Sequence, residues 1–124
     1  MKDLQSRLTA ASLSAPAAQT STVTGAAVDI RDYHGKLKVM QNVGTVSGTS
    51  PTLDGKIQDS ADGSTGWADV SGATFTQVTA STNHQSIGVD TRACKRYIRY
   101  VGTIAGTSPS FQLAVEFVGQ KQVQ

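Results

Sequence analysis

The chain has 124 residues, enough for one domain, and it is polar but sparsely charged. It contains 13 serines, 15 threonines and 12 glycines, whereas charged residues make up 16% and aromatic residues 6%. Threonine, valine, glycine and aspartate favour strands and turns, so the composition excludes a helical bundle, a coiled coil and a membrane-spanning helix. The net charge is only +2 and the basic residues are scattered, so we expect no direct contact with nucleic acid and no membrane contact.

The first 22 residues differ from the rest and predict an extended or flexible N-terminal arm, followed by one β-domain over residues 23–124. Leu4 and Leu8 lie four apart, on one face of a possible helical turn, and Leu13 is the one large apolar side chain in the following Ala- and Ser-rich stretch. Such an arm is either disordered in isolation or ordered against a neighbouring subunit. In the second case Leu4, Leu8 and Leu13 are candidate partner contacts.

From residue 21 onward, short β-branched segments alternate with turn signals. Strands are expected at 23–30, 37–46, 53–58, 67–70, 73–79, 86–90, 95–105 and 111–117. In the last of these, four large apolar residues alternate with Gln112, Ala114 and Glu116, which predicts one buried face and one wet face. About eight short strands predict an all-β, antiparallel sandwich, of either jelly-roll or immunoglobulin-like topology.

An internal repeat supports this architecture. Residues 43–53 match residues 101–111 at an offset of 58, with seven of the eleven positions identical, and both copies contain Gly-Thr-Ser-Pro. The glycine suits a positive φ and the proline suits a turn or the first position of a strand. We therefore expect structural turns at Gly48 to Pro51 and at Gly106 to Pro109, forming two equivalent hairpins either in one sheet or across a sandwich. A phosphate-binding loop is disfavoured, because a strand rather than a helix follows each copy.

The loop over residues 58–67 is rich in Asp, Ser and Gly. It lacks the ligand spacing of a helix-loop-helix calcium site, and its resemblance to an Asp-box is off by one position. We interpret it as a hairpin in which Asp62 and Gly63 form the tight turn and Trp67 covers the edge of the core.

Catalytic and metal chemistry have few candidate residues. The single cysteine, Cys94, excludes an internal disulfide, and with only two histidines a zinc site is improbable. Cys94 lies beside cations that lower a thiol pKa, but a small side chain entering a strand is the simpler interpretation. We therefore expect no enzyme activity and no cofactor. The first eight residues lack the apolar stretch of a secretory signal, so an intracellular product is expected.

The densest basic cluster comprises Arg92, Lys95, Arg96 and Arg99, with Tyr97 and Tyr100 nearby as possible stacking partners for bases. On a strand, however, Arg96 faces away from Lys95 and Arg99. We favour a solvated or salt-bridging surface that faces an acidic partner, and these four cations are candidate partner contacts.

The repeat and its surroundings resemble small virion structural proteins of tailed bacteriophages. The resemblance rests on a strand followed by Gly-Thr-Ser-Pro, a strand ending in Ile-Gln-Asp-Ser-Ala-Asp-Gly, then Arg-Tyr-Ile-Arg and a second Gly-Thr-Ser-Pro, over about residues 23–121. It implies a β-sandwich of the capsid decoration or cement type, made in the host cytoplasm and located on the outer surface of the capsid. It also implies the major capsid protein as partner and a homo-oligomer, a dimer or trimer.

Two other functions remain open. A tail, connector or fibre-associated protein of the virion would share the same features. A carbohydrate-binding module would use Trp67, Tyr97 and Tyr100 as sugar platforms, although the scarcity of aromatic residues argues against it.

Overall fold

The computed structural model describes residues 8–121, and side chains over residues 10–120. Its elements are β1 (Leu8–Gln19), β2 (Val23–Thr24), β3 (Val28–Asp29), β4 (Tyr33–Ser60), β5 (Ala68–Thr74), β6 (Asn83–Asp90), a 3₁₀ turn (Thr91–Ala93) and β7 (Tyr97–Lys121). All strand pairs are antiparallel. The predicted all-β class is confirmed.

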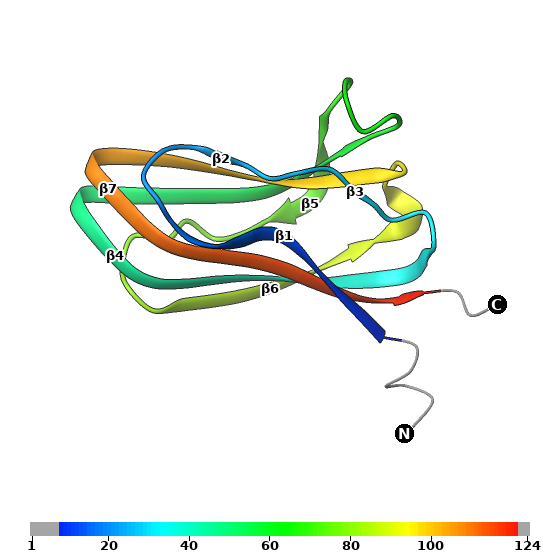
Figure 1. Cartoon of the computed structure of the whole chain (residues 1–124), viewed down its shortest axis with the longest axis horizontal. Coiled ribbons are helices and arrows are strands. Elements are labelled where there is room, and N and C mark those ends of the chain that lie inside the picture. Colours follow the sequence, from blue (N-terminus) through cyan, green and yellow to red (C-terminus); the bar gives the residue numbers. More distant parts are fainter. Residues whose placement is uncertain (1–7, 122–124) are drawn as a thin grey trace.

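The two longest strands, β4 and β7, run side by side and fold over together as a ribbon (Figure 1). Residues 38–47 of β4 pair with residues 110–118 of β7, and residues 52–60 pair with residues 97–105. Each strand therefore contributes one segment to each of two layers. One layer has the order β1, the second half of β7, the first half of β4, and β6. The other has β2 and β3 in line, the first half of β7, the second half of β4, and β5.

This pairing distinguishes between the two predicted topologies. If the eight segments are counted along the chain, the first pairs with the eighth, the second with the seventh, the third with the sixth and the fourth with the fifth. That scheme is a two-layer jelly roll. The chain is therefore a sandwich of jelly-roll type.

The Gly-Thr-Ser-Pro copies form the corner at which the ribbon changes layer. Thr49 pairs with Thr107, its equivalent in the repeat, so the two copies are related by a local two-fold axis. Gly48 and Gly106 have φ of 109° and 121°, and a Cβ on Gly48 would lie 2.6 Å from the carbonyl oxygen of Ser108. The glycines are required both by their φ and by this close approach.

The expectation of separate hairpin turns at Gly48 to Pro51 and at Gly106 to Pro109 is thus corrected. β4 and β7 continue through these residues as strands and bend without breaking their pairing. The two halves of each strand lie in opposite layers, and each copy of the repeat pairs with the other copy. A sequence motif for a bend is the same as a motif for a turn, and only the partner strand distinguishes them.

The N-terminal segment also differs from the expectation. Residues 8–19 form β1 and pair with β7 at the edge of a layer, and Leu13 is 2% exposed within the core. β1 is irregular between Ser12 and Ala17, where Pro16 interrupts the ladder. Residues 8–19 of the predicted arm therefore belong to the sheet. Backbone hydrogen bonds to β7 hold this segment in place, although most of its side chains are small. Leu4 lies outside the described residues.

A single core fills the space between the layers, and the alternation predicted for 111–117 is confirmed. Fully or almost fully buried residues of both layers include Leu37, Val39, Val43, Leu53, Ile57, Ile98, Tyr100, Phe111, Leu113, Val115 and Phe117. One polar pair lies among them: the Tyr100 hydroxyl donates to Oε1 of Gln41 over 2.6 Å and so joins the layers directly. Both side chains are 0% exposed.

Candidate interaction surfaces

The four predicted contact cations occupy two separate places. Arg92, Lys95 and Arg96 lie at one end of the sandwich, between β6 and β7, whereas Arg99 lies on the outer face of the layer that contains β5. The structure therefore brings three of the four together. It also adds Arg31, which lines the same end.

At this end the residues line a hollow of about 330 Å³. Arg96 is held by Asp29 over 2.9 Å, and that bond lowers the pKa of the Asp29 carboxyl. Arg92 lies 3.6 Å from Asp90 and its side chain is 86% exposed, so it remains available to a partner. The backbone N–H of Lys95 donates to Asp59 over 3.0 Å, which fixes the loop while the Lys95 side chain stays exposed. The end is a rim of cations around a shallow hollow.

Cys94 and His34 line this same hollow, and these are the residue types that a thiol enzyme needs. Burial, together with the carboxylates of Asp59 and Asp90, raises the pKa of the Cys94 thiol to about 11. A nucleophilic cysteine requires the opposite shift, because the thiolate is the reactive form. In the described part of the chain, no hydrogen bond joins Cys94 to His34.

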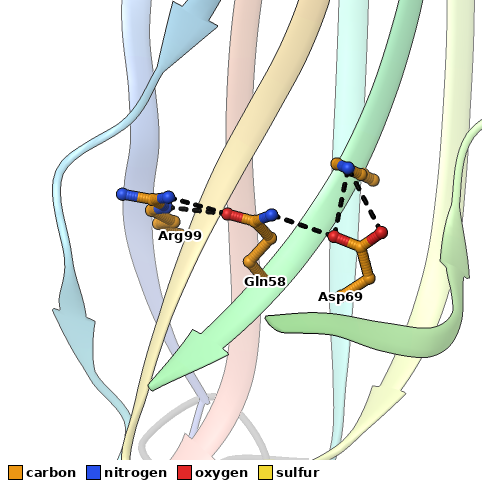
Figure 2. A network of polar contacts seen from close by, with 4 residues as sticks. Gln58, Asp69 and Arg99 are labelled. Carbon is orange, nitrogen blue, oxygen red and sulfur yellow. Dashed lines mark hydrogen bonds and ion pairs between the residues drawn. The ribbon is translucent and has the colours of Figure 1, made fainter. Parts of the chain in front are cut away.

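Arg99 belongs to a polar network that crosses three strands (Figure 2). Its guanidinium donates to Oε1 of Gln58 over 2.8 and 3.0 Å, and Nε2 of Gln58 donates to Asp69 over 2.9 Å. Lys56 completes the row at 3.1 Å from Asp69, and the hydrogen bonds from Gln58 and Lys56 lower the pKa of the Asp69 carboxyl. These groups satisfy one another, which is typical of a surface adapted to water.

Trp67 lies beside this network, with the Arg99 guanidinium carbon 4.2 Å from its ring centroid. The cation therefore covers one face of the indole. Tyr100 is 0% exposed and Tyr97 is half-buried beneath Arg96 at 5.1 Å. The three aromatic residues considered as sugar platforms do not form one exposed surface.

The loop between β4 and β5 is organised by Asp62 and projects from the body of the sandwich (Figure 1). Its carboxylate accepts from the backbone N–H groups of Thr65 and Ser64 over 2.8 and 2.9 Å and from the Thr65 hydroxyl over 2.9 Å. These bonds hold the pKa of Asp62 well below its usual range. Gly63 has a φ of 78° and packs over the Tyr97 ring. The predicted hairpin is present, but its loop spans residues 61–67 rather than a two-residue turn.

The three predicted leucine contacts have different positions. Leu13 is part of the core and is not accessible to a partner. Leu8 pairs with Gln120 through the backbone, and Leu4 lies outside the described residues. Sequence reasoning also missed Gln58 and Asp69, whose role depends on the register between β4 and β5.

Over the described residues, no group of three or more His, Cys, Asp and Glu side chains is placed to hold a metal ion. Nor does the described chain contain a helix long and apolar enough to cross a membrane. The features of the surface are therefore a cationic end, a self-satisfied polar face and a second outer face, formed by β1, β7, β4 and β6.

Comparison with known proteins supports the fold. No protein-family model matches the sequence, and neither does any curated protein sequence. Among solved structures, the chain is similar to one from the structure of infectious bursal disease virus, Gx strain, with a TM-score of 0.58 and 17% sequence identity. The match covers 90% of this chain and 31% of the viral chain, so the protein spans about a third of the length of that relative. The likeness shows a shared sandwich fold in a chain from a virus.

Proposed function

We propose that the protein is a structural component of a virion, which decorates and stabilises a bacteriophage capsid by bridging subunits of the major capsid protein. The observation that carries the proposal is the jelly-roll sandwich, which occupies nearly the whole described chain. Over 90% of this chain, the sandwich matches part of a chain from a virus. The resemblance of residues 23–121 to small phage virion proteins supports the bacteriophage assignment. The partner is the major capsid protein, and no enzyme activity or cofactor is part of the proposal.

The rigidity of the body suits such a role. The β4–β7 ribbon pairs continuously across both layers, and the hydrogen bond between Tyr100 and Gln41 fixes one layer against the other. A protein that bridges capsid subunits has to hold its contact surfaces at fixed positions relative to one another. A sandwich whose two layers share the same two strands meets this requirement.

We assign the contact with the capsid to the cationic end, where Arg92, Lys95 and Arg96 surround the hollow of about 330 Å³. Exposed cations that are only partly neutralised favour an acidic surface on the partner. In the full chain, residues 1–7 precede β1, and we retain them as a candidate arm.

The test mixes the purified full chain with purified particles of the source phage that lack this protein, and then sediments the particles. We expect the protein to sediment with the particles and to raise the temperature at which they open. Arg92→Glu weakens this binding, whereas the matched control Lys56→Glu, which makes the same charge change on the outer face that carries Asp69 and Arg99, does not. Binding by none of the proteins would refute the capsid role.

The second candidate is a tail, connector or fibre-associated virion protein, which has the same fold requirements. Electron microscopy of particles that carry a labelled chain distinguishes the two, because label confined to the tail excludes the capsid role. A carbohydrate-binding role is disfavoured by the burial of Tyr100 and by the cation that covers Trp67.

A further inference from the structure

β6 lies at the margin of its layer, with one edge against β4 and the other facing away from the sheet (Figure 1). Among the strands of the described chain it pairs with β4 alone. All eight of its residues, Asn83–Asp90, pair with residues 36–43 of β4 without a register shift. β6 is therefore a regular edge strand.

The hydrogen bond just before β6 shows which of its backbone groups face outward. The Thr82 N–H donates to the Gly44 carbonyl oxygen over 2.8 Å, one step before the first pair of the ladder. Hydrogen-bonded and non-hydrogen-bonded pairs alternate in an antiparallel ladder, so the even-numbered residues of β6 bond to β4. The N–H and C=O groups that point to the outer edge are therefore those of Asn83, Gln85, Ile87 and Val89.

The outward groups of Gln85 and Ile87 remain open. Over the residues that the structure describes, no hydrogen bond reaches them. The Gln85 side chain instead joins the two layers, because its amide accepts from the Thr76 N–H over 2.7 Å and donates to the Thr76 carbonyl over 2.9 Å. Ile87 is only half-buried against the core, so part of its side chain is in contact with water.

The other edges of the sandwich are less suited to accept a further strand. β2 and β3 are two residues long. β1 contains Pro16 and two register shifts, and the five steps from Asp69 to Thr74 in β5 lie opposite only two in β4. Short strands, prolines, bulges and edge lysines are the devices that prevent strand addition. β6 has no register shift and contains no proline, lysine or arginine.

We propose that an extended segment of the partner protein adds to the outer edge of β6 as a fifth strand of this layer. The inference rests on the proposed function, since it takes the segment to belong to the major capsid protein, and it names the kind of contact. Main-chain hydrogen bonds to Gln85 and Ile87 hold the segment. An apolar side chain on the segment covers the exposed part of Ile87.

The β6 edge is continuous with the cationic end to which we assigned the capsid contact. β6 ends at Asp90, whose carboxylate accepts from the Arg92 N–H over 3.0 Å, and the Arg92 side chain directly beyond is 86% exposed. A segment that follows β6 and continues past Asp90 brings an acidic side chain to Arg92. Backbone pairing then supplies affinity, and the charge fixes the position of the segment along β6.

Proline at position 87 separates edge pairing from the other contacts. Ile87→Pro removes an N–H that β4 does not use, and the proline ring blocks the approach of another strand. Ile87→Ala also shortens the side chain but keeps the N–H, so it is the matched control. We expect Ile87→Pro to weaken binding of the full chain to particles that lack this protein by roughly tenfold or more, and Ile87→Ala by less than about threefold. Circular dichroism of both variants checks that they fold.

A second measurement needs no variant and decides the question should Ile87→Pro fail to fold. Hydrogen–deuterium exchange, followed by digestion and mass spectrometry, compares the free natural chain with the chain bound to particles. We expect the peptide over residues 83–90 to gain protection at about three amides on binding, since alternate N–H groups face outward, and the peptide over β5 to gain none.

The outcomes distinguish this inference from the capsid role. If the natural chain does not bind the particles, both fail. If it binds while Ile87→Pro and Ile87→Ala bind equally, or while residues 83–90 gain no protection, the inference alone is overturned.

Discussion

Replacing Tyr100 by phenylalanine tests how the two layers are held together. The Tyr100 hydroxyl donates to Oε1 of Gln41 over 2.6 Å, and Nε2 of Gln41 is buried without a hydrogen-bond partner among the described residues. Tyr100→Phe thus leaves the whole Gln41 amide unsatisfied in the core. The lost bond costs about 1 kcal/mol and the orphaned acceptor adds about 1–2 kcal/mol, so we expect a loss of about 2–3 kcal/mol in the free energy of unfolding.

The assay is urea denaturation followed by circular dichroism, with every variant measured at the same protein concentration. Combining Tyr100→Phe with Gln41→Leu removes both polar partners. We expect the double variant to be more stable than the sum of the two single losses predicts, by about 1–2 kcal/mol. A Tyr100→Phe variant whose free energy of unfolding lies within about 0.5 kcal/mol of that of the natural chain would refute the reasoning.

Burial also raises the pKa of Tyr100 above its usual value near 10. The folded state therefore favours the protonated phenol, and the unfolded state ionises first as the pH rises. The stability associated with this group is fully present below pH 10 and is lost as the pH rises toward the folded pKa. We expect unfolding free energy to fall above pH 10, and to fall less steeply in Tyr100→Phe when each protein is compared with its own value at pH 8.

Three other predictions concern β1, the corner and the Asp62 loop. Leu13→Ala should cost about 2–4 kcal/mol in urea denaturation, whereas its exposed neighbour Ser12→Ala should change stability by less than about 0.5 kcal/mol; equal effects would exclude β1 from the core. Gly106→Ala, whose Cβ would lie 2.7 Å from the Ser50 carbonyl oxygen, should destabilise more than Gly72→Ala, which has a positive φ of 77° but no atom within 4 Å; the reverse order would contradict the corner geometry. Asp62 should stay ionised in an NMR titration to well below pH 3.8, and Asp62→Ala should remove stability that is present above pH 4 and lost at lower pH; an ordinary titration midpoint would contradict its hydrogen bonding.

The period-two pattern was enough to predict the core of the sandwich. Phe111 and Val115 are buried and Gln112 and Glu116 are exposed, as alternation requires. The same pattern places Gln41 in phase with Leu37, Val39 and Val43, so its burial could have been read from the sequence. Its bond to Tyr100 could not, because it depends on how the layers are stacked.

The features that sequence reasoning missed are those that depend on pairing between distant segments. Apart from Leu8 at its start, β1 has one large apolar side chain, Leu13, and its place in the sheet comes from backbone bonds to β7 that no side-chain pattern reports. The Gly-Thr-Ser-Pro copies indicated a change of direction, but their partners lie 58 residues away.

The central claim is that this jelly roll is a structural component of a bacteriophage capsid. A cryo-electron microscopy reconstruction of the phage particles that form in cells producing the protein tests it most directly. We predict density for the sandwich on the outer surface of the shell, contacting major capsid protein subunits through the end that carries Arg92 and Lys95. The claim would be contradicted if the capsid surface, resolved to side-chain detail, showed no density for this fold and the particles contained no copy of the chain.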